Sequence, residues 1–550
     1  MKNLFGGLRY AVFILPLIFL LVFFFYPLTN IFRITLTSEG IKELFSKSYY
    51  LKTVWFTFWQ ATLSTALTIV LGLPAAYLFA RYEFRGKGLF RALATVPFVL
   101  PTIVVAAAFR ALLGPSGPAN GLLMSLLPFL DRAPIRLEQT LTIILLAHVY
   151  YNIAVVIRLV GGYWANLSPN LTDAARLLGA SPLKAFQTVT LPLLRPPLLS
   201  AALLIYLFTF TSFGVILILG GPAFSTVETE IYRQYVTFLN PSIAAALSLL
   251  QIFFTFILML LYAHFQRKSA VPLDLRPQKS TLRKPSSTAE KSLVWSMILL
   301  YGFLLLAPLI ALVVQSFQDQ AGGFTLAYYK ALPELRRGSI LFISPSEAII
   351  NSIGYALLTM LLASMLGLAS AWLLSQPRKG RTLLEPVFML PLGASAVTLG
   401  FAYVLSLGAL RTSAVLVLIA HTLVALPFVV RSVLPVLQGI TPSLRESALV
   451  LGATPIRVWR EIDMPIVGRA LLVAAVFAFT ISMGEFGATS FIARPNSGFL
   501  TLPIAIQRYL GQPGSLNFGQ ALAMSAILMA VCTVGFIAIE RFRYSDIGEF

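Results

Sequence analysis

Apolar runs of about 20 residues recur from one end of the chain to the other, and they constrain the fold more than any other feature of the sequence. A run of this length is what an α-helix needs to cross a bilayer. Hydrophobic residues make up 58% of the 550 positions and charged residues only 11%, which leaves too few polar side chains to cover a soluble protein of this size. The sequence therefore predicts an all-α integral membrane protein with about twelve transmembrane helices.

A polar segment between two of these runs, residues 168–192, returns 273 residues later as residues 441–465. Each copy begins with Ser-Pro or Thr-Pro, the pair typical of a helix N-cap followed by the first helical position. Gly179 and Gly452 occupy the same place in the two copies, where a left-handed residue would end a helix. Each copy therefore predicts a helix, a glycine break and a second short helix.

The repeat divides the chain into two similar halves. Residues 1–266 form the first half with about six spans, and residues 292–550 form the second. Residues 267–291 are basic, rich in Pro and Ser and without apolar periodicity, which indicates a cytoplasmic linker. Both repeat loops fall on the same side of the membrane, so the halves are predicted to be parallel repeats with a substrate path between them.

The net charge of +20 could indicate a nucleic-acid partner, but its distribution favours a membrane topology. With the N-terminus placed inside, most Lys and Arg residues fall in cytoplasmic segments, as the positive-inside rule requires. The first apolar run, 11–28, is too long for a signal peptide and is predicted to be a retained span. We expect a multi-pass protein of the bacterial or archaeal inner or plasma membrane, with both termini cytoplasmic, the bilayer as a partner and no nucleic acid.

The motifs for catalysis are absent from the sequence. It contains no G-x-x-x-x-G-K-[ST] run for ATP phosphates, no H-E-x-x-H and no G-x-S-x-G. The single cysteine, Cys532, excludes a disulfide framework and a thiolate metal cluster. The chain is therefore predicted to be no enzyme, with no catalytic residues, no metal site and no cofactor of its own.

The repeated loop resembles the EAA loop of ABC importer permeases, in which an acidic residue and two small residues precede a glycine, and a proline closes the motif. In that family the loop is the coupling helix that docks into a cytoplasmic ATPase. The resemblance assigns this role to Asp173, Ala174, Ala175, Gly179 and Pro192 in the first copy, and to Glu446, Ser447, Ala448, Gly452 and Pro465 in the second.

The resemblance implies a permease subunit of an ATP-driven importer that works by alternating access. Two ATPase subunits would bind ATP, and an extracytoplasmic solute-binding protein would deliver a small solute. Fused two-half chains of this kind resemble the ferric-iron and thiamine transport permeases, and residues 484–509 point to that branch without choosing between the two substrates. The alternative is a secondary transporter driven by an ion gradient, also built from six-span repeats.

Several further residues are candidates for a role. Glu485 lies in an apolar run and could line a cation path, or it could lie near the external end of its span and reach water or pair with Arg494. His148 and His421 are equivalent in the repeat and could bind a metal together, or each could form hydrogen bonds within its own half. Glu228 and Glu230 could meet the binding protein or be solvated loop charges, and the second reading is favoured.

Two local expectations complete the prediction. Asp173 and Glu446 are predicted in the first turn of their helices, where a carboxylate favours the positive end of the helix dipole or contacts basic groups of the ATPase. The third span, predicted at 93–113, contains Pro97 and Pro101, which indicate a kink near the path or an ordinary packing kink.

Overall fold

The computed structural model describes residues 14–542 except 38, 128, 130–131, 270–281, 337–338, 340, 377–380, 412 and 494–497. Within these residues the regular structure is helical, with two isolated β-bridges. Eleven helices are long and apolar enough to cross a membrane, and a bent helix pair would make a twelfth span. This confirms the predicted all-α membrane fold.

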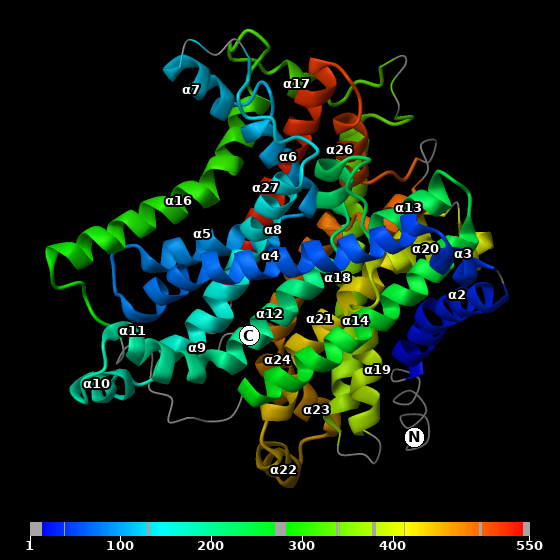
Figure 1. Ribbon diagram of the computed structural model, residues 1–550. Helices are drawn as coiled ribbons and strands as arrows, with labels where there is room; N and C mark the ends of the chain where they lie inside the picture. Colours follow the sequence, from blue (N-terminus) through cyan, green and yellow to red (C-terminus); the bar gives the residue numbers. More distant parts are fainter. Residues whose placement is uncertain are drawn as a thin grey trace.

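The first half contains helices that span the membrane and shorter helices between them (Figure 1). The long or apolar helices are α2 (Tyr26–Thr37), α4 (Ser48–Arg81), α6 (Thr102–Leu113), α8 (Leu141–Val155), α12 (Leu191–Phe210) and α14 (Pro241–Ser269). The shorter ones are α3 (Gly40–Ser46), α5 (Lys87–Val99), α7 (Pro118–Leu126), α9 (Gly161–Ala165), α10 (Pro169–Leu177), α11 (Pro182–Ala185) and α13 (Val227–Val236).

The second half follows the same plan. Its long or apolar helices are α16 (Thr288–Ser316), α18 (Pro345–Ser375), α19 (Arg381–Gly393), α20 (Ala396–Ser406), α21 (Ala414–Gly439), α24 (Met464–Gly484) and α27 (Ser515–Phe542). The shorter ones are α17 (Ala327–Lys330), α22 (Pro442–Val450), α23 (Pro455–Val458), α25 (Gly487–Ile492) and α26 (Leu502–Leu510).

The sequence repeat is also a structural repeat, down to single hydrogen bonds. Helix α4 packs on α8 and α12, as α18 packs on α21 and α24. The first amide of α13, Val227, donates to the Thr57 hydroxyl of α4 at 2.9 Å. The first amide of α26, Leu502, donates to the Ser352 hydroxyl of α18 at 2.6 Å. Each half therefore fixes its short helix, α13 or α26, to its long helix in the same way.

The first helix of each half packs against the other half. Helix α2 contacts α20, and α16 contacts α4, α5 and α6. The Tyr301 hydroxyl of α16 donates to the carbonyl of Leu71 at 2.6 Å, and the Tyr150 hydroxyl of α8 donates to the carbonyl of Leu305 at 2.9 Å. Both bonds cross the boundary between the halves, so the two repeats interlock and do not form separate bodies.

One span in each half is broken. The third span starts at Lys87, earlier than predicted, and breaks at Leu100 and Pro101 between α5 and α6. In the second half, α19 and α20 meet at an angle of 95°. Pro101 and Ser395 are the N-cap residues of α6 and α20, so Pro101 marks a complete break in the helix.

The end of the linker is bound to the first half. The amide of Glu83 donates to the carbonyl of Arg283 at 2.9 Å, and the amide of Arg283 donates to the carbonyl of Arg81 at 3.0 Å. The Arg283 guanidinium also donates to Glu290 at 2.7 Å. These bonds attach the start of α16 to the turn that follows α4.

Candidate coupling surface

The two repeat loops fold into the predicted helix, glycine break and second helix. Helices α10 and α11 form the first copy, at the lower left in Figure 1, and α22 and α23 form the second, at the bottom. Gly179 has a φ of 87° and Gly452 a φ of 84°, which is the left-handed region where glycine avoids the strain of a Cβ. This confirms the predicted geometry of both loops.

The small residues before each glycine supply the carbonyl groups that close the helix end. The amide of Ala180 donates to the carbonyl of Ala175 at 3.1 Å, and the amide of Ala453 donates to the carbonyl of Ala448 at 3.0 Å. The amides of Gly179 and Gly452 donate to the carbonyls of Arg176 and Leu449, both at 3.0 Å. Together these bonds form the Schellman closure of a helix C-terminus, which makes the turn rigid.

The second short helix of each loop is capped by a hydroxyl. Ser181 accepts from the amide of Lys184, and Thr454 accepts from the amide of Arg457, both at 3.3 Å. Ser168 and Thr441 precede a proline at the first helical position as predicted, but their hydroxyls make no cap hydrogen bond. Pro192 and Pro465 are the second residues of α12 and α24, directly after π-helical turns that already interrupt the ordinary i to i−4 bonding of a continuous helix.

The acidic residues of the motif lie one turn later than predicted. Asp173 and Glu446 are the fifth residues of α10 and α22, and the first turns of these helices contain no acidic side chain. The predicted first-turn interaction with the helix dipole is therefore wrong, because that interaction fades beyond the first turn. Both carboxylates are exposed, and Asp173 is close enough to Arg81 for an electrostatic attraction.

An apolar pair before each glycine is almost fully exposed. The exposed fractions are 90% for Leu177, 89% for Leu178, 87% for Val450 and 88% for Leu451. Leu183 and its repeat equivalent Ile456 are exposed as well. None of these residues was predicted to have a role, although a Leu-Leu or Val-Leu pair before both glycines is a readable signal in the sequence. Equivalent apolar residues are therefore exposed on both rigid loops.

Each coupling helix is attached to the start of the next span by one polar pair. In the first half the hydroxyls of Thr172 and Thr190 are 3.3 Å apart. At the same repeat positions, Arg445 Nε donates to Asp463 Oδ1 at 2.7 Å. Thr190 and Asp463 each end a π-helical turn that leads into the span, so each pair joins α10 or α22 to the start of α12 or α24.

Glu485 is buried at the break between α24 and α25. Its Oε1 accepts from the amide of Ala488 at 2.7 Å, and its Oε2 accepts from the amide of Thr489 at 3.0 Å. Its Oε2 also lies 3.2 Å from His421 Nε2. These contacts cap α25, and a role of Glu485 in the substrate path stays a prediction.

The two histidines do not meet. His148 contacts the hydroxyls of Ser64 and Ser212, at 3.0 and 2.9 Å. His421 contacts the hydroxyls of Ser482 and Thr489, at 2.7 and 2.9 Å. Each histidine therefore forms hydrogen bonds within its own half, as the second of the two readings predicts. Among the described residues no group of three or more His, Cys, Asp or Glu side chains could hold a metal ion.

The prediction for Glu228 and Glu230 is wrong, because both side chains are fully buried. Glu230 accepts hydrogen bonds from Tyr49, Ser225 and Gln234, at 2.9, 3.0 and 2.6 Å. Glu228 accepts from Gln251 and, at 3.1 Å, from Ser395 of the second half. The error arose because the two carboxylates were taken for charges of an external loop, whereas the segment folds inward as α13.

Known proteins resemble this chain over most of its length. A family model for the binding-protein-dependent transport system inner membrane component matches residues 68–271 and 348–543. The thiamine transport system permease protein ThiP of Salmonella typhimurium is 26% identical over 515 residues, covering 92% of this chain and 91% of the relative. ThiP of Haemophilus influenzae is 25% identical over 555 residues, covering 98% and 97%.

The two matched regions each contain one repeat loop, and each begins within α4 or its equivalent α18. The fused relatives are matched along both halves, which agrees with the interlocked arrangement of the two repeats. The chain belongs to the family of binding-protein-dependent transport system inner membrane components, as a fused permease with two halves.

Proposed function

We propose that this chain is the permease subunit of an ATP-driven importer and that its two coupling loops dock into two cytoplasmic ATPase subunits. The observation that carries the proposal is the equivalent pair of exposed apolar residues on each rigid loop, Leu177 and Leu178 in one and Val450 and Leu451 in the other. An exposed apolar pair is costly in water and is stabilised when a partner groove covers it. Because the apolar pairs of the two loops are equivalent, they fit two copies of the same ATPase subunit.

The cycle follows from how the loops are attached. When ATP draws the two ATPase subunits together, each coupling helix moves with the subunit that holds it. The polar pairs Thr172–Thr190 and Arg445–Asp463 transmit this motion to α12 and α24. The two halves then rock against each other and expose the path to opposite sides in turn.

Thiamine is the substrate that we propose first, because the fused relatives named above are thiamine transport system permeases. A solute-binding protein on the external side would deliver it. Ferric iron, which the sequence resemblance also suggested, is the second cargo to test in the same assay.

The experiment is uptake of radiolabelled thiamine into proteoliposomes that contain the chain, its ATPase and its binding protein. We expect uptake that requires ATP and that is lost in Leu178→Asp plus Leu451→Asp, since a carboxylate cannot enter an apolar groove. A matched control, Asn170→Asp plus Ser443→Asp, adds the same charge at exposed positions of α10 and α22 and should keep uptake.

Uptake that is driven by an ion gradient and indifferent to ATP would overturn the proposal in favour of a secondary transporter. Uptake of ferric iron with no uptake of thiamine would keep the permease function and change the cargo.

A further inference from the structure

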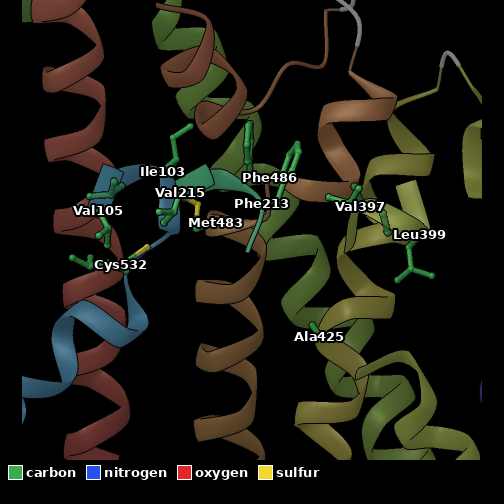
Figure 2. Packing of buried hydrophobic residues seen from close by; sticks show 14 of the residues in the cluster. Ile103, Val105, Phe213, Val215, Val397, Leu399, Ala425, Met483, Phe486 and Cys532 are labelled. Atoms are coloured by element: carbon green, nitrogen blue, oxygen red, sulfur yellow. The ribbon is translucent and has the colours of Figure 1, made fainter. Parts of the chain in front are cut away.

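Two phenylalanines at equivalent positions of the repeat stack on each other. Phe213 and Phe486 are separated by the repeat offset of 273 residues, and their ring centroids lie 5.1 Å apart with an angle of 27° between the planes. Figure 2 shows the two side chains side by side between the helices. Two equivalent residues of a parallel repeat touch where the pseudo-two-fold axis passes between them, so this pair marks the centre of the interface between the halves.

Further rings from both halves extend this pair into what we call the ring cluster. Tyr232 of α13 lies 5.5 Å from Phe213 and 5.4 Å from Phe491 between ring centroids. Tyr235 lies 5.2 Å from Phe401. The rings come from α13 and the segment after α12 in the first half, and from α20, α25 and the N-cap residue of α25 in the second. The members are Phe213, Tyr232, Tyr235, Phe401, Phe486 and Phe491.

The ring cluster lies at the membrane side opposite to the coupling loops. Helix α12 follows the first coupling loop directly and ends at Phe210, so Phe213 lies at the far end of that span. Helix α24 follows the second loop and ends at Gly484, just before Phe486. The coupling loops face the cytoplasm in the proposed function, and the ring cluster therefore closes the interface at the external end.

The broken spans pack directly against the residues that follow the two central rings. A Cβ on Gly214 would lie 2.5 Å from the Thr102 hydroxyl, and one on Gly487 would lie 2.9 Å from the Cβ of Ala396. Thr102 and Ala396 are the first residues of α6 and α20. A shift of α6 or α20 must therefore displace the ring beside it, because neither glycine leaves room for relative motion.

A buried carboxylate lies on the same face of α13 as the two tyrosines. Glu228, Tyr232 and Tyr235 follow the spacing i, i+4, i+7 that places side chains on one side of a helix. Glu228 is fully buried and forms no ion pair with any residue that the structure describes. Its partners are the neutral side chains of Gln251 and Ser395. A buried carboxyl group without a counter-charge is costly in its ionised form, so a cation that enters beside it would stabilise the carboxylate.

We propose that the ring cluster is the external gate of the transport path and that Glu228 is the counter-charge for an organic cation that passes it. Separation of Phe213 from Phe486 would open the path, and the exposed ring faces would stabilise the cation as it crosses. Ser395, which donates to Glu228, also caps α20, so opening at the broken span frees the carboxylate for the substrate. This proposal rests on the permease function proposed above.

The other charged groups near the ring cluster have contacts of their own. Arg508 of α26 interacts electrostatically with Tyr232, and its Nη2 donates to the carbonyl of Ala493 at 3.2 Å, whereas its buried Nη1 has no hydrogen-bond partner among the described residues. Glu230 lies on α13 with three hydrogen-bond donors and with Arg233 at 4.0 Å. Glu228 is thus the acidic group left to meet a substrate cation.

The gate is tested by leak from proteoliposomes without ATP, ATPase or binding protein. Radiolabelled choline serves as a small organic cation and erythritol as a neutral solute. We expect Phe213→Ala plus Phe486→Ala to leak both probes, whereas wild type retains them. The matched control is Phe428→Ala plus Phe477→Ala, which removes a ring pair 5.4 Å apart between α21 and α24 and should stay tight. A tight Phe213 and Phe486 double variant that still performs ATP-driven uptake would overturn the gate.

A cross-link tests the gate even if the alanine variant does not fold. The variant Phe213→Cys plus Phe486→Cys is made with Cys532→Ala, which removes the only native cysteine. A short bis-maleimide should join the two positions, abolish ATP-driven uptake and leave the bound ATPase in place. Uptake at the wild-type rate after complete cross-linking would contradict the proposal.

The role of Glu228 is tested in the leaky double-alanine variant. Adding Glu228→Gln should lower the ratio of choline leak to erythritol leak by about fivefold, the effect expected for losing a modest charge interaction. Adding Glu230→Gln serves as the control and should leave the ratio unchanged. If Glu228→Gln leaves the ratio of choline leak to erythritol leak unchanged, Glu228 is not the counter-charge for the cation. Because neither leak assay involves an ATPase, failure here is distinct from failure of ATP-driven uptake, which would overturn the proposed function.

Discussion

Arg445 Nε donates to Asp463 Oδ1 at 2.7 Å and so joins the second coupling helix to the start of α24. The equivalent residues of the first half, Thr172 and Thr190, form a hydroxyl pair at 3.3 Å. The two coupling loops are therefore attached by interactions of different strength, because an ion pair shielded from water is stronger than a contact between two hydroxyls. Because the two attachments differ, a mutation can weaken one coupling loop without weakening the other.

Removing the ion pair should loosen the second coupling helix more than the matched change loosens the first. For Asp463→Ala we expect a loss of about 2 kcal/mol in the local stability of α22, between the values for exposed and for buried pairs. For Thr190→Val we expect less than about 1 kcal/mol, the value of a neutral hydrogen bond. Hydrogen exchange of α22 and α10 measures both effects. Equal protection of the two helices in both variants would contradict the prediction.

The glycine of each coupling loop should resist a side chain for conformational reasons alone. A Cβ on Gly179 or Gly452 would meet no atom within 4 Å, so no clash is involved. We expect Gly452→Ala to cost about 1 kcal/mol because of the left-handed backbone, and Gly452→Asn to cost less because Asn tolerates that region. Thermal unfolding and ATP-driven uptake check the order of the three proteins. A Gly452→Asn protein that is less stable than Gly452→Ala would show that the size of the side chain, not the backbone conformation, limits this position.

The stability of the protein should depend on pH through Glu228. Burial raises the pKa of its carboxyl to about 8, and the hydrogen bonds from Ser395 and Gln251 oppose that rise only in part. The folded protein therefore holds the Glu228 proton to a higher pH than the unfolded chain does. The proton stabilises the folded state fully below the unfolded pKa, and this contribution to the free energy of unfolding is lost as the pH rises through about 8. The wild type should therefore lose stability between mildly acidic pH and pH 8 relative to Glu228→Gln. Identical pH profiles of unfolding temperature for the two proteins would refute this.

Glu485 should stabilise the break between α24 and α25. Glu485→Ala removes two backbone cap bonds and the contact with His421, and we expect a loss of about 2–3 kcal/mol because buried amides and the imidazole lose their acceptor. The control is Ser212→Ala, the equivalent position of the first half, where the carboxylate is replaced by a hydroxyl that contacts His148. Thermal unfolding in detergent measures both, and an equal effect of the two variants would contradict the capping role of Glu485.

Much of the fold and of the coupling surface could be predicted from the sequence because each feature is local. Apolar length gives the spans, and Gly179 and Gly452 give the shape of the loops, since only the backbone conformation is at stake. The repeat offset also makes Phe213 and Phe486 equivalent positions from the sequence alone. That the two rings touch could not be read from the offset, because contact depends on how the halves pack.

Three features of the site were predicted wrongly or missed, for different reasons. Glu228 and Glu230 follow a loop composition, yet they are buried because α13 folds back between the spans. The prediction for Asp173 and Glu446 was wrong for a local reason: each helix starts at the predicted proline, and the fifth residue from that start already lies beyond the first turn. The apolar pairs before both glycines can be seen in the sequence, but only the structure shows that they are exposed in both copies.

The most direct test of the central claim is a site-specific cross-link between each coupling loop and the ATPase. A photoactivatable probe is attached to a single cysteine at position 178 or at position 451, in chains that also carry Cys532→Ala, and the captured protein is identified by mass spectrometry. We predict that both positions capture the same P-loop ATPase and that a probe at Leu357, an exposed residue of α18, does not. Absence of an ATPase from both products, in membranes that contain the intact transporter, would contradict the account.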